Sequence, residues 1–163
     1  MNVLIRVSDT LSRLCGLVSM VLLAAATAVV TQMVFMRYVL RESTVWQTEF
    51  VIYSLIASTF IGAPYVLLHK GHVGVDLLPQ MLPRAAAKAL RILASLLSLA
   101  FFAAIFWSSW HYFYEAASKG WTTDTVAAIP LWIPLLPLPL GMGMLLIQGL
   151  AEIAKILGAE TAA

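Results

Sequence analysis

The sequence contains a single cysteine, Cys15, among 163 residues, so no intramolecular disulfide can form. A cysteine-ligated zinc site, an iron–sulfur cluster and a membrane thiol oxidase are excluded as well, because each needs several thiols. Charged residues are also scarce, at 11% of the chain against about 25% in an average soluble domain. The formal net charge of +2 is too small to indicate a polyanionic partner, so we expect no nucleic-acid binding.

Apolar side chains, by contrast, are abundant. They make up 61% of the residues, against about 45–50% in an average soluble domain. A soluble globule of this size cannot bury so much apolar surface. The composition therefore excludes a soluble enzyme and a disordered chain, and the length fits one domain over residues 1–163.

Four apolar runs are long enough to cross a bilayer, whose hydrocarbon core of about 30 Å needs about 20 helical residues. Backbone polar groups in hydrocarbon must be paired within the segment, so each run is predicted to be a helix. The predicted fold class is an all-α integral membrane protein with four transmembrane helices. The spans cover residues 14–36, 45–68, 89–114 and 129–153.

The first span can also be interpreted as a cleaved signal peptide. Arg6 and Arg13 precede it, and the small-residue triplets around Ala26 resemble cleavage sites. The apolar run continues past these alanines to Met36, which favours a retained span.

The segment between the second and third spans has a helical pattern of its own. Its apolar residues fall on one helical face, Asp76 can cap the first turn, and Pro79 lies where a missing N–H costs little. We predict a short amphipathic helix over residues 77–82 that lies in the membrane interface. The alternative is an irregular loop that happens to carry apolar residues.

Basic residues are distributed unevenly around the spans. Arg37, Arg41 and Lys119 flank the first and third loops, whereas the other seven lie at the N-terminus, in the second loop and at the C-terminus. Because Lys and Arg are enriched in cytoplasmic segments, both termini are predicted to be cytoplasmic. The loops Arg37–Thr44 and Glu115–Ala128 then face outward, and aromatic side chains cluster at that interface.

Glu49 is the only carboxylate within the second span. It lies about one turn inside the outer boundary, and Arg37 at the end of the first span is close enough to be its partner. An interfacial ion pair that fixes helices or subunits together is the favoured interpretation. The alternative is a proton- or cation-coupling acid, as in a small self-sufficient transporter.

The remaining polar residues indicate no active site, so we expect neither enzyme activity nor a bound cofactor or metal. His69 and His72 are separated from His111 by most of the bilayer, which argues against a haem shared between histidines and against a redox-enzyme anchor. The prolines of the fourth span are predicted to disturb its first half without forming a transport site. Glycines such as Gly16, Gly62 and Gly141 offer close helix packing, as expected for a subunit of a larger assembly.

Short motifs in a fixed order along the four spans resemble a known transporter family. They cover nearly the whole chain, and Thr48 departs from the family's Trp-x-Glu-Glu pattern at its first acid. The motifs are Arg37-Tyr38, Trp46 with Glu49, Gly62-Ala63, His72-Val73-Gly74-Val75-Asp76-Leu77-Leu78, Pro130-Leu131-Trp132 and Pro139-Leu140-Gly141. On these motifs the sequence is similar to the small membrane subunit, or small permease, of tripartite ATP-independent periplasmic (TRAP) transporters.

The resemblance implies a non-catalytic scaffold subunit in a bacterial inner membrane. Its implied partners are membrane lipid, a large multi-span subunit that carries substrate and sodium ions, and a periplasmic substrate-binding protein. The implied function is sodium-coupled symport of an organic acid such as a C4-dicarboxylate or a sialic acid. The motifs also imply a structural or subunit-interface role for Arg37, Trp46, Glu49, His72 and Asp76.

A transporter that is fed by a soluble protein needs a polar outer face. Mixed charges around an aromatic side chain suit a transient interface, because rim charges steer the encounter and the aromatic supplies contact area. The outward loops offer this combination, and the candidate docking residues are Arg41, Glu42, Lys119, Trp121 and Asp124. An ordinary solvated loop is the alternative interpretation.

Overall fold

The computed structural model describes residues 2–69, 83–125 and 127–158. Its elements are α1 (Asn2–Phe35), the π-helical turn η1 (Met36–Leu40), α2 (Val45–Leu68), α4 (Arg84–Ser118), α5 (Trp132–Leu135) and α6 (Pro137–Gly158). Four segments are long and apolar enough to cross a membrane, which confirms the predicted all-α membrane fold. The helix predicted over residues 77–82 lies outside the described residues.

Two helices are longer than their predicted spans. α1 begins well before residue 14, and α4 extends the third predicted span at both ends. At about 1.5 Å per residue each helix is about 50 Å long, which exceeds the hydrocarbon core of about 30 Å. Each therefore tilts or extends beyond the core. The prediction followed apolar residues alone, whereas Arg6, Asp9 and Arg13 continue the helix without being apolar.

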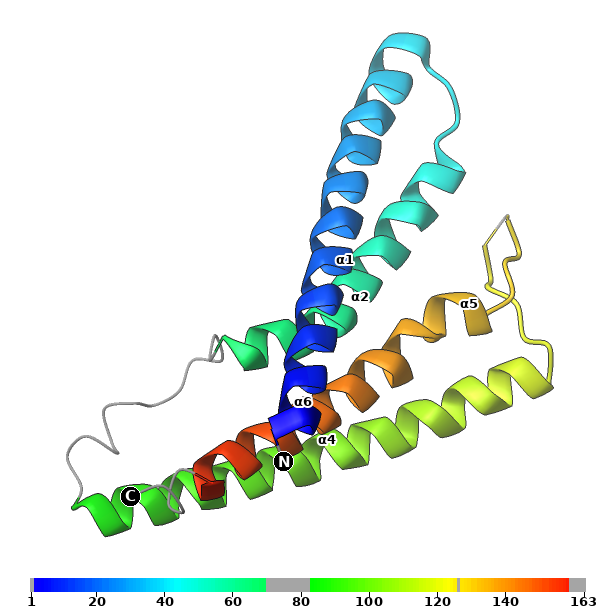
Figure 1. Cartoon of the computed structure of the whole chain (residues 1–163). Helices are drawn as coiled ribbons and strands as arrows, with labels where there is room; N and C mark the ends of the chain where they lie inside the picture. The colour runs from blue at the N-terminus through cyan, green and yellow to red at the C-terminus, as the bar shows by residue number, and fades with distance from the viewer. Residues whose placement is uncertain (1, 70–82, 126, 159–163) are drawn as a thin grey trace.

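α6 occupies the centre of the arrangement. α1 and α2 form an antiparallel hairpin, and α4 runs alongside α6 (Figure 1). α6 contacts α1, α2 and α4, whereas α1 and α4 do not contact each other within the described residues. The α1–α2 hairpin is therefore joined to α4 through α6, and large parts of α1 and α4 remain uncovered by the other described residues.

Small residues set the crossing of α1 and α2. A Cβ added to Gly16 would lie 2.4 Å from Cγ of Tyr65, and one added to Gly62 would lie 2.6 Å from Oγ of Ser19. Ser19 also donates a hydrogen bond from Oγ to the backbone oxygen of Ser58, at 2.7 Å. In lipid, where no hydrophobic force drives helices together, close packing and interhelical hydrogen bonds of this kind hold the pair.

A second close crossing joins α2 to α6 at the bend in α2. Pro64 has no N–H, so the helical hydrogen bond to the carbonyl of Phe60 is missing and the helix bends (Figure 1). Gly141 of α6 packs against this same carbonyl, because an added Cβ would lie 2.2 Å from the oxygen of Phe60. The proline and the glycine together bring the two backbones into contact.

The fourth span is interrupted where its prolines predict. α5 ends at Leu135, and α6 begins at Pro137, a position where a helix needs no N–H donor. The break is small, because the amide of Leu140 still bonds to the oxygen of Leu136. The predicted disturbance of the first half is thus confirmed.

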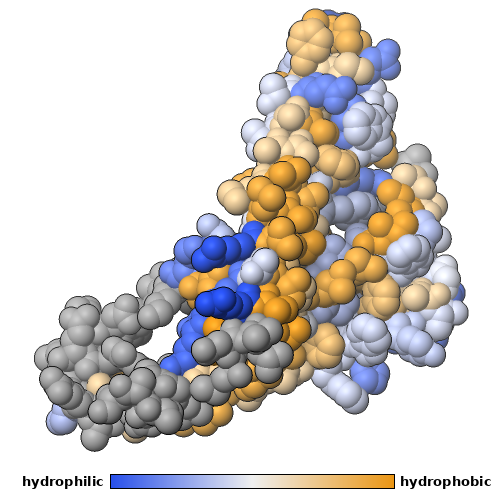
Figure 2. All heavy atoms as spheres, viewed as in Figure 1, coloured by the Kyte–Doolittle hydropathy of each residue, from blue (hydrophilic) through white to orange (hydrophobic). Residues whose placement is uncertain are grey.

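The visible surface is mainly hydrophobic over the helices, as a lipid-facing or subunit-facing protein requires. Hydrophilic residues are mixed with hydrophobic ones near the tip of the α1–α2 hairpin, and the deepest blue lies lower on the molecule, next to the grey atoms (Figure 2). Exposed tryptophans and tyrosines lie near the loops, among them Trp107, Trp110 and Tyr114 of α4. This distribution fits helices that end at a membrane interface.

Candidate functional site

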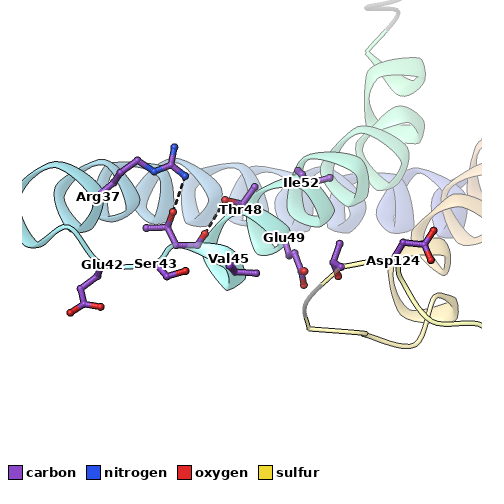
Figure 3. Close-up of a pocket in the computed structure, with 10 residues that line it drawn as sticks. Arg37, Glu42, Ser43, Val45, Thr48, Glu49, Ile52 and Asp124 are labelled. Carbon is purple, nitrogen blue, oxygen red and sulfur yellow. Dashed lines mark hydrogen bonds between the residues drawn. The ribbon is translucent and has the colours of Figure 1, made fainter.

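A cavity of about 580 Å³ lies where the start of α2 meets two loops (Figure 3). The first loop, residues 41–44, forms one wall, and the third loop, residues 119–131, forms another. The lining combines acids, one base and hydroxyls with two apolar side chains. The lining residues are Arg37, Glu42, Ser43, Thr44, Val45, Thr48, Glu49, Ile52, Asp124 and Thr125.

Glu49 is the most unusual group of this cavity. Glu49 is only 6% exposed, and neither of its carboxylate oxygens has a hydrogen-bond partner among the described residues. Figure 3 shows its side chain directed from α2 towards the third loop. A buried carboxylate without a donor is costly, because it has lost its hydration and gained nothing in exchange.

Gln47, two residues earlier on α2, is also buried without full pairing. It is 1% exposed, and its Oε1 atom accepts no hydrogen bond from the described residues. Most buried polar groups in proteins are hydrogen-bonded, so two such residues at one helix start call for an explanation. No described residue supplies the missing donors.

The predicted pairing of Arg37 with Glu49 is wrong. Arg37 lies in η1, and its Nη2 donates to Oγ1 of Thr44 at 2.9 Å. The residue after η1, Arg41, has a left-handed backbone with φ 56°, which turns the chain sharply into the first loop. The guanidinium therefore meets Thr44, whereas Glu49 is directed away from it towards the third loop (Figure 3).

The candidate docking residues divide between the cavity and the surface beside it. Glu42 and Asp124 both line the cavity, although they are far apart in sequence. Lys119 pairs with Glu115 on α4 and lies 5.4 Å from the ring centroid of Trp121. Its charge is thus already engaged by its own neighbours.

The third loop has a conformation that is fixed by backbone hydrogen bonds. Gly120 has φ +63°, and the amide of Trp121 bonds to the oxygen of Ala116, which together end α4 with a Schellman motif. The amide of Leu131 then bonds to the oxygen of Trp121. Asp124 and Thr125 of this loop line the cavity opposite the start of α2.

The other predicted residues contribute less to the cavity. Trp46 is 55% exposed at the start of α2 and does not line it. Arg41 is exposed on the first loop. His72 and Asp76 lie outside the described residues. The histidine Nδ1 atoms of His69 and His111 each lie 3.1 Å from a backbone oxygen of their own helix.

A second polar group, which the sequence analysis missed, joins α1 to α6 near the chain ends. We call it the α1–α6 cluster, and its members are Ser8, Asp9, Ser12, Gln148, Glu152 and Lys155. Gln148 is fully buried and accepts from both serines, at 2.6 and 2.8 Å. Lys155 donates to Asp9 at 2.9 Å and to Glu152 at 2.8 Å.

The cluster had a sequence signal. Ser8 and Ser12 are one helical turn apart, as are Gln148 and Glu152, so each pair shares a helix face. Nothing in the sequence, however, indicates that these two faces meet. Each member of the cluster makes at least one hydrogen bond or ion pair within it, so the cluster fixes the register of α1 on α6.

Comparison with known proteins decides the family. The model of the family "Tripartite ATP-independent periplasmic transporters, DctQ component" matches residues 26–158. The chain belongs to this family. A curated relative, the C4-dicarboxylate TRAP transporter small permease protein DctQ of Vibrio cholerae serotype O1, is 24% identical over 144 residues.

That alignment covers 76% of this chain and 62% of the relative. The DctQ family match includes the whole lining of the Glu49 cavity and the α6 side of the α1–α6 cluster. It confirms the predicted resemblance to a TRAP small membrane subunit. As a member of the DctQ family with four apolar helices, the chain is a multi-pass membrane protein.

Proposed function

We propose that the chain is the non-catalytic scaffold subunit of a sodium-coupled TRAP transporter in a bacterial inner membrane. The transporter imports an organic acid, such as a C4-dicarboxylate, a sialic acid or a similar carboxylate. A periplasmic binding protein delivers the substrate, and a large membrane subunit carries it together with sodium ions. The family match over residues 26–158 carries this proposal.

The arrangement of the helices supports a scaffold role. α6 contacts α1, α2 and α4, and the α1–α6 cluster together with the close glycine crossings makes these helices one packed unit. Exposed apolar side chains cover much of α1 and α4. These faces suit lipid and a second membrane subunit, and sodium ions are expected to bind the large subunit.

The alternative is a self-sufficient small transporter that uses Glu49 as its coupling acid. The burial of Glu49 in a cavity at the start of a span is the observation that favours this alternative. A coupling acid must be reached from both sides of the membrane. Glu49 lies at one end of α2, which makes the scaffold role the better supported one.

Uptake by reconstituted liposomes tests the proposal. Liposomes with this chain, the large subunit and a sodium gradient should accumulate a labelled organic acid only when the soluble binding protein is added. Omitting this chain should abolish assembly of the transporter, and this chain alone should transport nothing. Proton-driven uptake by liposomes that contain this chain alone would establish the alternative.

A further inference from the structure

We infer that the cavity beside Glu49 receives a basic side chain of the large membrane subunit, which pairs with the Glu49 carboxylate. The inference rests on the proposed function, because it needs the large subunit as partner. The starting observation is Glu49 itself, which is 6% exposed and lines the cavity, and whose carboxylate oxygens have no hydrogen-bond partner in the part of the chain that the structure describes.

The charges around the cavity favour a cationic guest. Three carboxylates line it, those of Glu42, Glu49 and Asp124, against the single guanidinium of Arg37. That guanidinium is already bonded to Thr44. A positive group that enters would therefore meet an excess of negative charge, and it would supply the donors that the Glu49 oxygens lack.

The size and lining of the cavity favour a side chain over a bare ion. A volume of about 580 Å³ is far larger than an ion without its water. Among the described residues, no group of three His, Cys, Asp or Glu side chains is placed to hold a metal. Val45 and Ile52 in the lining suit the methylene stem of a lysine or arginine, whose charged end then reaches the acids.

The depth of Glu49 favours the large membrane subunit over the soluble binding protein. Glu49 lies past the first turn of α2, within a segment apolar enough to cross a membrane. A partner that docks and leaves in every transport cycle would repeatedly abandon a buried carboxylate. A permanently assembled subunit keeps it paired, as in an obligate interface.

Replacing Glu49 by glutamine should act in opposite directions on the chain and on the complex. Glu49→Gln removes an unpaired buried charge from the isolated chain, so its melting temperature in detergent should stay equal or rise. In the complex the same change removes the partner of a basic side chain, so recovery of the large subunit with the tagged chain should fall about tenfold or more.

The control is Glu115→Gln, the same chemical change at an exposed acid that pairs with Lys119 outside the cavity. It should leave recovery of the large subunit unchanged. A lower melting temperature of the isolated Glu49→Gln chain would show that Glu49 stabilises its own fold, and would overturn the inference. Equal recovery of the large subunit by wild type and Glu49→Gln would overturn it too.

The partner residue can be found by selection. Starting from Glu49→Lys, which places two like charges together, mutations that restore uptake are selected with the genes of both this chain and the large subunit open to mutation. The inference expects them to change a lysine or arginine into an acid or a neutral residue. Restoring mutations found solely within this chain would overturn the inference.

Failure of the inference is distinguishable from failure of the proposed function. If the wild-type chain does not co-purify with the large subunit, the proposed function fails. If it does, and Glu49→Gln assembles normally but loses the sodium dependence of uptake, the inference alone fails, and Glu49 is a coupling acid.

Discussion

Gln148 holds the largest set of side-chain hydrogen bonds in the described structure. Its Oε1 accepts from Ser8 and Ser12, and its Nε2 donates to Asp9 at 3.1 Å and to Glu152 at 3.3 Å. Both polar atoms of this buried side chain are thus hydrogen-bonded, and the bonds join two helices that are distant in sequence. The residue fixes α1 to α6 where the small-residue crossings do not reach.

Replacing Gln148 by leucine should therefore lower the free energy of unfolding by about 1–3 kcal/mol, because two buried serine hydroxyls lose their acceptor. The matched control is Gln32→Leu on α1, where the glutamine is exposed and has no such role. Thermal unfolding in detergent measures both variants. An equal melting temperature for wild type and Gln148→Leu would contradict the structural role of the α1–α6 cluster.

Individual residues were the hardest feature to predict. Glu49 stood out in the sequence because a carboxylate in an apolar span is rare, and its burial agrees with that signal. The prediction of its partner was wrong, because hydropathy does not predict the turn at Arg41, after which Thr44 lies within hydrogen-bond distance of Arg37. The α1–α6 cluster was missed because it depends on which helix faces meet.

At the scale of helices, the α2–α6 crossing depends on Gly141. A Cβ at this position would lie 2.2 Å from the oxygen of Phe60, which is backbone and cannot rotate away. Gly141→Ala should therefore separate the helices and cost about 1–3 kcal/mol of stability. Gly149→Ala on the same helix is the control, since its Cβ would lie 3.3 Å from a leucine methyl that can move. Equal loss of stability in both variants would show that the loss comes from replacing a glycine within α6 and not from the α2–α6 crossing.

The third loop carries a prediction for the docking of the binding protein. Reversing the charges of Arg41 and Lys119 together should slow uptake at low concentrations of binding protein and leave the membrane complex assembled. Asp124 is kept unchanged, because it lines the cavity that we propose receives a basic side chain of the large subunit. Raising the binding protein should restore the rate, because mass action offsets a weaker docking step. Because Lys119 pairs with Glu115, a control that reverses Glu115 alone separates loss of this pair from loss of docking. Unchanged uptake across the concentration range would place docking on the large subunit alone.

The helices themselves were predictable, since long apolar runs in lipid leave the backbone no other way to pair its polar groups. The break before Pro137 followed from proline chemistry in the same way. The length of α1 and α4 was not predictable from hydropathy, because polar residues at a helix end are compatible with the helix and only mark where the apolar run stops. The packing order, with α6 at the centre, came from the structure alone.

At the scale of the whole molecule, the remaining prediction is its direction in the membrane. The uneven distribution of Lys and Arg predicts that both termini lie in the cytoplasm and that the first and third loops lie outside. The structure offers exposed reporters for each side: Ser43 and Ser118 beside the two loops, and Thr10 and His69 at the opposite helix ends.

Each is replaced singly by cysteine in a Cys15→Ala background, which removes the one native thiol. An impermeant thiol reagent applied to intact cells with a permeable outer membrane should label the Ser43→Cys and Ser118→Cys chains. The Thr10→Cys and His69→Cys chains should react only after the inner membrane is opened. Labelling of Thr10→Cys but not of Ser43→Cys in intact cells would show that the topology is the reverse of the predicted one. The Glu49 cavity would then open to the cytoplasm, out of reach of a periplasmic binding protein.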